Sequence, residues 1–449
     1  MHSTYRLQLS KQAGQKMENG EHHQSVNIDR LADTLRGKFR SLHRLPQKCC
    51  IYRVPQQIRG LNPKAHTPQL VSIGPFHHGD SEELRATEEI KIRYLEYFLQ
   101  RTEVSIETFL ADVKNKEEQL RDCYAETIRL ENEDFITMVL EDAVFLIEFL
   151  LRYSFPNLVS TGDPIFTKSR LISNMWLDIW LLENQLPLFI LDDLFNLAKT
   201  AVNHDSYNGV SLLSLTRRFY KDNYEFPLME ANLFETHFKQ AQHFLDLLRL
   251  CFQPPQPRSC RAQNKLRTET QNIPTATQLH QAGVKFQLGS SANLFDITFN
   301  VEGILEIPLL RISESTEILF RNLQAFERLH CGTRYINDYV IIMNYLVNTA
   351  HDVDLLVQNR VIENWLWNSE AVSNLFHNLV QETSLSAKNF QYTDLVEDLR
   401  AYCRYRWHRW KAMLRQDYFN SPWASISVIA AVILLLLTLI QAICSIIAL

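Results

Sequence analysis

The sequence predicts an α+β fold that is mainly α-helical, with a small antiparallel β element and one C-terminal transmembrane helix. Three observations support this prediction. Long segments after Ser81 carry apolar residues at helical spacing. Three short β-like runs follow one another between residues 284 and 312. The stretch from Ala424 to Leu449 contains no charged residue, which is typical of a membrane-spanning helix.

The composition favours a folded body and lowers the expectation of nucleotide binding. Of the 449 residues, 46% are hydrophobic, and 25 Phe, 16 Tyr and 7 Trp are enough for a packed core. Only 12 glycines occur, although phosphate-binding turns require glycine because it lets the backbone approach a ligand closely. No dinucleotide, P-loop, zinc-protease or serine-hydrolase motif is present. We therefore predict that the chain is not an enzyme and needs no cofactor.

Charge and cysteine patterns divide the chain. Residues 1–47 are polar and form a mobile basic arm, since residues 1–50 hold nine Lys or Arg against four Asp or Glu. The net charge of −5 makes the remaining body more acidic, which does not favour nucleic acid as a partner. The arm could touch an anionic membrane surface. The eight cysteines contain no C-x-x-C pair, so we expect reduced thiols without a zinc site or disulfide framework.

The folded domain is expected to cover residues 48–418. Short apolar runs broken by Pro and Gly predict extended segments and turns from Cys50 to Gly79. A helix follows over residues 81–101, where Ile92, Leu95 and Leu99 stand at helical spacing.

Two further segments, residues 135–153 and 171–195, are apolar enough to resemble membrane spans, but charges and a proline interrupt them. A charge at the centre of a bilayer costs roughly 2.5–3.5 kcal/mol, so both segments are predicted as buried core helices. The interrupting residues are Glu141, Asp142 and Glu148 in the first segment, and Asp178, Glu183 and Pro187 in the second.

The second half of the domain begins with a polar, proline-bearing stretch at about residues 253–280, which we predict to be a loose surface insertion. The β-like runs VKFQL, LFDITFNV and ILEIPLLRI then suggest a small antiparallel meander. Helical patterning resumes from Glu314 to about Gln416. The body is therefore expected to be mainly helical with minor strand.

The predicted anchor occupies residues 424–449. Its last 24 residues would span roughly 36 Å as a helix, which covers a bilayer core of about 30 Å with some tilt. Upstream, basic and aromatic side chains fall on separate helical stripes, as in a helix lying among lipid headgroups. Alternatively, the tryptophans complete the globular core. The predicted membrane-interface residues are Arg404, Trp407, His408, Trp410, Lys411, Arg415 and Trp423.

The anchor also predicts topology. No apolar signal segment opens the chain, so membrane insertion would depend on the C-terminus. Five Lys or Arg lie between Arg404 and Arg415 and none follows the helix. By the positive-inside rule, the body faces the cytosol and the C-terminus faces the lumen or exterior. The plasma membrane is one candidate location.

Four groups of polar residues could carry chemistry, but each has a structural interpretation. His77 and His78 are adjacent, so on an extended strand they point to opposite faces and are not expected to bind one metal ion. Asp142 should face apolar neighbours and form a structural ion pair with Lys91 or Arg93. Glu183, with the two polar residues that follow it, should bond backbone groups where a helix breaks before a proline. Asp134, Glu141, Glu148 and Arg152 form one polar stripe that is solvated or paired.

Several of these motifs resemble the plant family called domain of unknown function 247, or UPF0481. The resemblance rests on IYRVP, NPKAHTPQLVSIGPFHHG, KIRYL, LLENQLPLFIL, GVKF and the closing PWASISVIAAVILLLLT, and it covers residue 50 to the C-terminus. His66, Thr87, Ala143 and Val144 depart from the family pattern. The resemblance implies a plant protein with a helical body and one C-terminal membrane helix. Some grass members are implicated in pollen-side self-incompatibility, which implies a recognition or signalling role.

Three hypotheses for function follow. The first is a membrane-anchored protein whose helical body binds an unidentified protein partner, while its C-terminal helix contacts membrane lipid. The second is an unrecognised enzyme that uses buried carboxylates such as Asp142 or Glu183, and the third is a membrane scaffold that assembles through its anchor. A deep pocket lined with acids and histidines would favour the enzyme, whereas a filled core with a broad apolar surface would favour binding.

Overall fold

The computed structural model describes most of the chain. The described residues are 28–40, 49–79, 82–201, 209–222, 231–253, 273–291, 293–381, 383 and 390–404, together with 426, 430, 433–438 and 440–441. The chain divides into two units, Met1–Leu45 and Pro46–Leu449. In the first unit, helix α2 (Ile28–Arg40) is amphipathic, and its Ile28, Leu31 and Leu35 are exposed.

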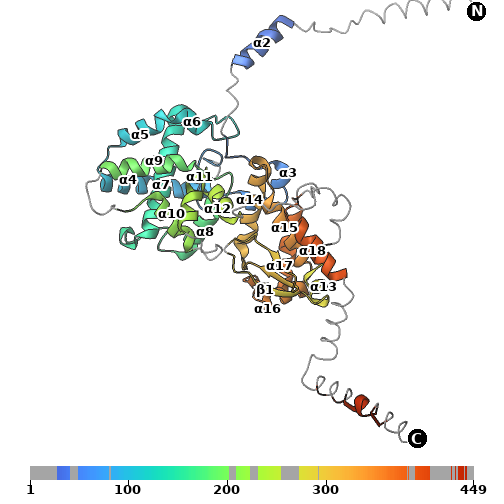
Figure 1. Ribbon diagram of the computed structural model, residues 1–449. Helices are drawn as coiled ribbons and strands as arrows, with labels where there is room; N and C mark the ends of the chain where they lie inside the picture. The colour runs from blue at the N-terminus through green and yellow to red at the C-terminus, as the bar shows by residue number, and fades with distance from the viewer. Residues whose placement is uncertain are drawn as a thin grey trace, which may run out of the picture. The chain divides into compact units, whose positions relative to one another are not determined.

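The second unit is mainly helical, as the sequence predicts. Figure 1 shows its earlier helices, in blue-green to green, gathered around α7, and its later helices, in orange, gathered with the strands. The earlier elements are α3 (Gln56–Arg59), the 3-10 helix η1 (Pro63–His66), α4 (Glu82–Thr102), α5 (Ile106–Asn115), α6 (Glu117–Arg121), α7 (Asn132–Ser154), the 3-10 helix η2 (Pro156–Leu158), α8 (Ser169–Ile179), α9 (Leu188–Ala201), α10 (Leu212–Lys221), α11 (Ala231–Gln240) and α12 (Phe244–Phe252).

The later elements complete the unit. They are α13 (Ala276–Gln281), β1 (Lys285–Leu288), β2 (Thr298–Phe299), β3 (Ile304–Ile307), β4 (Leu310–Ile312), α14 (Glu314–His330), α15 (Tyr335–Leu346), α16 (Ala350–Gln358), β5 (Ile362–Asn364), α17 (Ser369–Val380) and α18 (Thr393–Arg404). Strand β5 interrupts the region that the sequence predicts to be helical.

Helix α7 is the centre of the first group of helices. It packs against α4, α5, α9 and α10. Its 23 residues are apolar on nearly all sides, which is expected of a helix surrounded by protein, and its first turn carries Glu133 and Asp134, whose charges favour a helix N-terminus. The break between α8 and α9 falls at residues 180–187, where LLENQLP places a proline directly before α9.

The second group of helices begins with local capping signals. Capping boxes start α13, α14 and α16, where the side chains of Thr275, Ser313 and Thr349 accept backbone N–H groups of the first turn. Helix α17 packs on α14, α15 and α16, and α14 also packs on α12 and α8 of the first group. One continuous set of buried apolar side chains joins both groups.

The prediction of an antiparallel meander was wrong. The three-stranded sheet has the order β1-β3-β2, in which β1 and β3 are parallel and β2 and β3 are antiparallel. Only two residues of the LFDITFNV run form a strand, which is β2. Strand β2 lies on the opposite side of β3 from β1, so β3 is the central strand of the sheet. Pro308 ends the ILEIPLLRI strand early, because proline has no N–H for a ladder bond. The following β4 pairs instead with β5, in parallel.

Part of the stretch predicted to be a loose insertion is a helix. Residues 254–272 lie outside the described residues, but α13 occupies Ala276–Gln281 and buries Leu279. Its capping box at Thr275 and Gln278 is a helix-start signal within the stretch that we predicted to be loose.

The predicted membrane segment falls largely outside the described residues. Of residues 424–449, only 426, 430, 433–438 and 440–441 are described. Arg404 ends α18 and is exposed, whereas Trp407, His408, Trp410, Lys411, Arg415 and Trp423 are not described. Within the described part of the chain, no single helix has the length and apolarity to cross a membrane. Helices α15 and α16 meet such a criterion only when joined across a bend of 99°.

Candidate functional site

The segment from Cys49 to Gly79 crosses the core with little regular secondary structure. It contains an isolated parallel bridge between Ile51 and Tyr124, the short helix α3 and the turn η1. Many of its residues are buried. Buried backbone N–H groups need acceptors. Some in this segment bond backbone carbonyls, as the N–H groups of Cys50 and Ile51 bond the Cys123 carbonyl at 2.9 Å, and side chains accept others.

Asp178, near the end of α8, accepts three of these N–H groups. Its carboxylate accepts the N–H groups of Gln69, Leu70 and Val71 at 2.8, 2.7 and 2.8 Å. Burial raises the pKa of Asp178 to about 6, although the three N–H groups oppose the increase. A single side chain therefore fixes three consecutive residues of the segment.

Asn184 and Gln185 act at the break between α8 and α9. The Oδ1 atom of Asn184 accepts the N–H of Ile73 at 2.7 Å, and its Nδ2 donates to the carbonyl of Val71 at 3.0 Å. Gln185 Nε2 donates to the carbonyl of Leu181 at 2.7 Å, near the end of α8. The sequence predicts the bond of Gln185 to the nearby end of the helix. It does not predict the bonds of Asn184 to Val71 and Ile73, because these join residues more than 100 positions apart.

Asp142 is buried and paired with Lys91. The two charged groups lie 2.6 Å apart, with 1% and 0% of their side chains exposed. Of the two basic residues considered from the sequence, Arg93 is exposed on the other side of α4. Burial lowers the pKa of Lys91, but the charges of Asp142 and Glu88 raise it further, so its pKa is above the usual value.

The second oxygen of Asp142 holds the backbone at Gly74. Oδ2 accepts the Gly74 N–H at 2.7 Å. Gly74 has φ +74°, and a Cβ there would lie 2.6 Å from the carbonyl oxygen of Gln185. Only glycine fits this turn without displacement. Asp142 and Gly74 together fix the path of the GPFHHG stretch.

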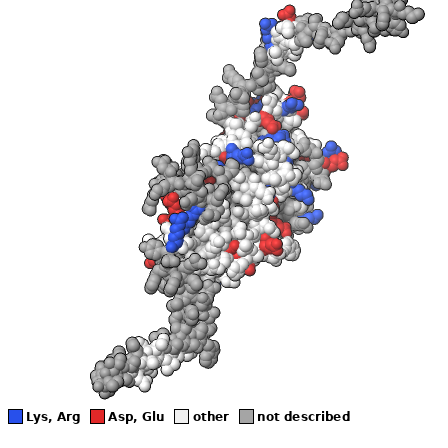
Figure 2. Space-filling model, turned by 90° about the vertical axis from the view of Figure 1, so that its right-hand side faces the viewer, with Lys and Arg blue, Asp and Glu red and all other residues white. Residues whose placement is uncertain are grey.

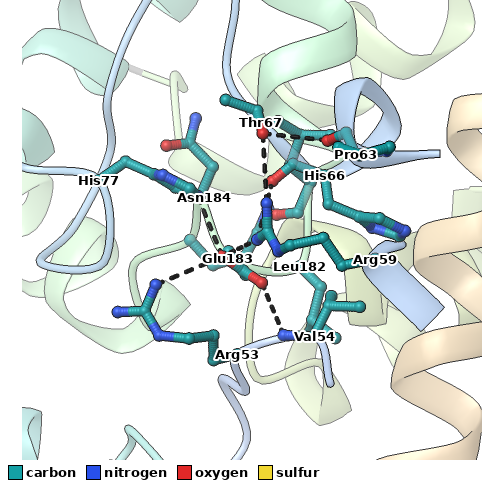
Figure 3. Close-up of polar contacts among 12 residues, drawn as sticks. Arg53, Val54, Arg59, Pro63, His66, Thr67, His77, Leu182, Glu183 and Asn184 are labelled. Carbon is teal, nitrogen blue, oxygen red and sulfur yellow. Dashed lines mark hydrogen bonds and ion pairs between the residues drawn. The ribbon is translucent and has the colours of Figure 1, made fainter. Parts of the chain in front are cut away.

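Glu183 is the centre of a second cluster, drawn in Figure 3. Its Oε1 accepts the N–H of Val54 at 2.6 Å. Its Oε2 contacts the guanidinium of Arg59 and lies 3.1 Å from Nε2 of His77 and 3.7 Å from Nη1 of Arg53. Burial favours the neutral acid, but hydrogen bonds from His77, Val54 and Arg59 outweigh it, so the pKa of Glu183 is lowered.

The histidines of this region take separate positions. His77 faces Glu183, and His66 is buried with its Nδ1 3.3 Å from Oδ1 of Asn322. Burial lowers the pKa of His66 to about 4. Among the described residues, no group of three His, Cys, Asp or Glu side chains could hold a metal ion. The expectation that His77 and His78 bind no metal stays a prediction.

The polar stripe of α7 is paired rather than solvated at its C-terminal end. Glu148 is fully buried and contacts the guanidinium groups of Arg101 and Arg152. Arg152 Nη1 lies 2.8 Å from Asp163 Oδ2, which also accepts the hydroxyl of Tyr94 at 3.0 Å. This network ties α7 to α4 and to the loop that precedes α8.

An open cleft of about 700 Å³ lies beside the Glu183 cluster. Arg53 joins the two, because its Nε lies 3.1 Å from Glu126 in the cleft wall while Nη1 points to Glu183. The guanidinium of Arg53 stacks 4.6 Å from the ring centre of Phe76. The cleft is lined by Arg53, Pro75, Phe76, Glu126, Thr127, Ile128, Arg129 and Leu130.

The arrangement is suited to holding a ligand through arginine, aromatic and backbone groups. The buried acids Asp142, Asp178 and Glu183 all bind backbone N–H groups of the Cys49–Gly79 segment. The same segment supplies Arg53, Pro75 and Phe76 to the cleft. Sequence reasoning missed Arg53 and Arg129. Arg53 stands in the IYRVP motif, which is the only signal that could have drawn attention to it.

Comparisons with known proteins decide the family. The model of a family described as plant protein of unknown function, DUF247, matches residues 51–437. The chain belongs to the DUF247 family. The UPF0481 protein At3g47200 of Arabidopsis thaliana is 29% identical, with 88% of this chain and 86% of the relative covered. The putative UPF0481 protein At3g02645 of the same plant is 23% identical, with 87% and 89% covered. No solved structure matches.

The structure gives a physical account of the motifs that first indicated the DUF247 family. IYRVP, SIGPFHHG and LLENQLP are far apart in the sequence, but they meet in the two carboxylate clusters. Thr87 of α4 donates its hydroxyl to the carbonyl of Leu70 in the NPKAHTPQLVSIGPFHHG motif. Three of the motifs in this DUF247 chain therefore form one structural unit.

Proposed function

We propose that this protein is a membrane-anchored recognition or signalling component whose body binds another protein through the cleft beside Arg53. The observation that carries the proposal is the cleft itself. It combines two arginines with the ring of Phe76, and arginine and aromatic side chains are enriched where proteins bind each other. Buried hydrogen bonds from the Val54 N–H to Glu183 and from the Gly74 N–H to Asp142 hold the side of the cleft that carries Arg53 and Phe76, so little ordering of this side is needed when a partner binds.

The location of the buried acids supports binding over catalysis. An acid or base catalyst must come within hydrogen-bond reach of a substrate. Asp142 and Glu183 are each 1% exposed, and their oxygens already contact Lys91, Arg59 and backbone N–H groups. We therefore rank the unrecognised enzyme below the binding protein, and the membrane scaffold below both.

The anchor and its orientation remain parts of the proposal. Residues 424–449 lack charge, and the basic residues before them favour a cytosolic body at a membrane such as the plasma membrane. Acidic and basic residues are interspersed on the face drawn in Figure 2, which supports a protein partner over nucleic acid. A role in self-recognition, as suggested for some family members, is one form of this function.

Proximity labelling in plant cells tests the binding function. The labelling enzyme is fused to the N-terminus of the full-length chain, and wild type is compared with Arg129→Glu and Arg85→Glu. Arg129 is in the cleft, whereas Arg85 is an exposed arginine of α4. We expect Arg129→Glu to lose a set of labelled proteins that Arg85→Glu retains. An unchanged set in the Arg129→Glu sample would contradict the proposal.

Protease digestion of sealed microsomes tests the orientation. The body should be digested while a tag after Leu449 stays protected. A protected body with a digestible tag would reverse the proposed topology.

A further inference from the structure

One wall of the cleft is a stretch of chain with unused backbone hydrogen-bonding groups. The Ala125 N–H donates to the carbonyl of Ile51 at 2.9 Å, next to the bridge between Ile51 and Tyr124. After Ala125, no further backbone hydrogen bond joins the described residues that follow Ile51 to those that follow Tyr124. Only the side-chain contact between Arg53 and Glu126 continues the pairing among the described residues.

On this wall, one arginine side chain binds the carbonyls of two alternate residues, and the backbone groups of Thr127 and Arg129 bond no described residue. Arg121 donates to the carbonyls of Ile128 and Leu130, at 3.1 and 3.0 Å. Two alternate carbonyls bound by one side chain are the pattern of an extended chain, and from this pattern we infer that the backbone groups of Thr127 and Arg129 point away from Arg121. In the part of the chain that the structure describes, neither residue makes a backbone hydrogen bond.

Such an edge can accept another extended chain. An unpaired row of N–H and C=O groups is a template for strand addition, and peptide-binding domains use this mode with side-chain pockets for specificity. Here Phe76, Ile128 and Leu130 supply apolar contacts along the cleft. A volume of about 700 Å³ is within the range of built ligand sites, which is roughly 300–1,000 Å³.

The charges of the cleft select the chemistry of the added chain. Arg129 is exposed and forms no ion pair with any described residue. The charge of Arg53 is shared with Glu126 and Glu183, and Arg59 also contacts Glu183. Among the residues that the structure describes, the charge of Arg129 therefore has no counter-ion, which favours a carboxylate on the ligand.

We propose that the cleft binds an extended, acidic peptide segment of a partner protein, which adds as a strand along Thr127–Arg129 and places a carboxylate against Arg129. This inference rests on the proposed binding function and names the chemistry of the partner. Main-chain pairing supplies general affinity, and Arg129 selects acidic sequences over basic ones.

Peptide pools of defined chemistry test the inference with the full chain in detergent micelles. Three fluorescent ten-residue pools share random apolar residues at alternate positions. The first carries Glu at the remaining positions, the second carries Lys, and the third is the Glu pool with alternate backbone nitrogens methylated. Fluorescence polarisation gives the dissociation constants. The Glu pool should bind at least about tenfold more tightly than either of the others.

Variants separate charge from strand addition. Arg129→Gln should weaken binding of the Glu pool about tenfold, and it is expected to fold because Arg129 is exposed. Thr127→Pro removes the N–H that a strand would use, and it should weaken binding similarly. Arg85→Gln is the matched control, since Arg85 is 69% exposed on α4, and it should bind as wild type does.

Several outcomes would overturn the inference. Equal binding of the Glu and Lys pools would reject acidic selection, and equal binding of the methylated pool would reject strand addition. Unchanged binding of the Glu pool by Arg129→Gln would show that the acidic peptides do not bind at Arg129 in the cleft. A peptide with the sequence of residues 41–48 tests whether a segment of this chain occupies the cleft. If this peptide binds and the Glu pool does not, the inference is also overturned.

The two proposals can fail separately. If Arg129→Glu changes the labelled proteins in cells but the Glu pool does not bind, the binding function stands and the acidic strand is wrong. If neither experiment responds to the change at Arg129, both proposals are wrong.

Discussion

The segment Cys49–Gly79 and the helical pair α14–α15 are both packed into the core, but their backbone N–H groups are satisfied in different ways. In α14 and α15 nearly all of these groups bond within the helix. Where the first turn of α15 lacks internal acceptors, Glu327 accepts the N–H groups of Ile336 and Asn337. The Cys49–Gly79 segment instead depends on distant side chains such as Asp178, Asn184 and Asp142.

The difference shows why polar residues occur inside an otherwise apolar region. A regular helix can be buried with few polar side chains, whereas an irregular buried segment needs an acceptor for each exposed N–H group. Removing one carboxylate should therefore damage the irregular segment more than the helical pair.

Asp142→Ala should have the largest effect. It removes the closer of the two carboxylates that contact the buried ammonium group of Lys91 and leaves the Gly74 N–H without an acceptor. Breaking a buried ion pair from one side costs roughly 3–5 kcal/mol of unfolding free energy. The urea midpoint of the purified full chain measures the loss.

Glu141→Ala is the control for helix propensity. Glu141 stands next to Asp142 on α7 but is only half-buried, so its removal should cost under about 1 kcal/mol. Equal midpoints for the two variants would reject the proposed structural role of Asp142 and would weaken the contrast between the two regions.

Asp338 gives a pH-dependent prediction for the helical region. It is a buried residue of α15 whose Oδ2 accepts the Gln391 N–H at 2.8 Å. Burial raises its pKa from 3.8 to about 7. Between pH 4 and pH 7 the unfolded chain has lost this proton while the folded protein retains it, so the unfolding free energy should fall as pH rises. The expected loss is on the order of 3 kcal/mol.

Asp338→Asn removes this ionisation while its side-chain oxygen can still accept the Gln391 N–H. Urea midpoints at pH 4, 5.5 and 7 should therefore fall less steeply in this variant than in wild type. Asp178, whose pKa is raised to about 6, remains in both proteins and contributes the same slope to each. Parallel curves for the two proteins would contradict the prediction.

Glu126→Ala should have the smallest effect on stability. Glu126 pairs with Arg53 at the surface, where their side chains are 50% and 41% exposed, and such pairs contribute about 0–1 kcal/mol. The midpoint should therefore stay within about 1 kcal/mol of wild type. A loss as large as that of Asp142→Ala would mean that the cleft wall is as important to the fold as the buried pairs.

The sequence was sufficient for features that depend on local spacing. The patterns of neighbouring residues predict helix α4, which contains Ile92, the long apolar helix α7, and the helix break before Pro187. Helix α13 was missed although Thr275 and Gln278 form a capping box, because the proline-bearing stretch before it suggested a loop.

Features that depend on distant pairing could not be predicted in the same way. The order β1-β3-β2 depends on which side of β3 the chain passes, and this is not encoded in the alternation of any one strand. The choice of Lys91 over Arg93 depends on how α4 is rotated against α7. The acceptor role of Asp178 needed knowledge of a segment more than 100 residues earlier.

The position of the Cys49–Gly79 segment has a consequence for synthesis on the ribosome. Tyr52 bonds His330 and the Ala65 carbonyl bonds Asn322, so its partners are 278 and 257 residues further along the chain. At about 5–20 residues per second, those partners are made roughly 15–55 s after the segment itself. During that interval the segment cannot complete its contacts, and its apolar residues are available to chaperones. The part of the body made first is therefore completed last.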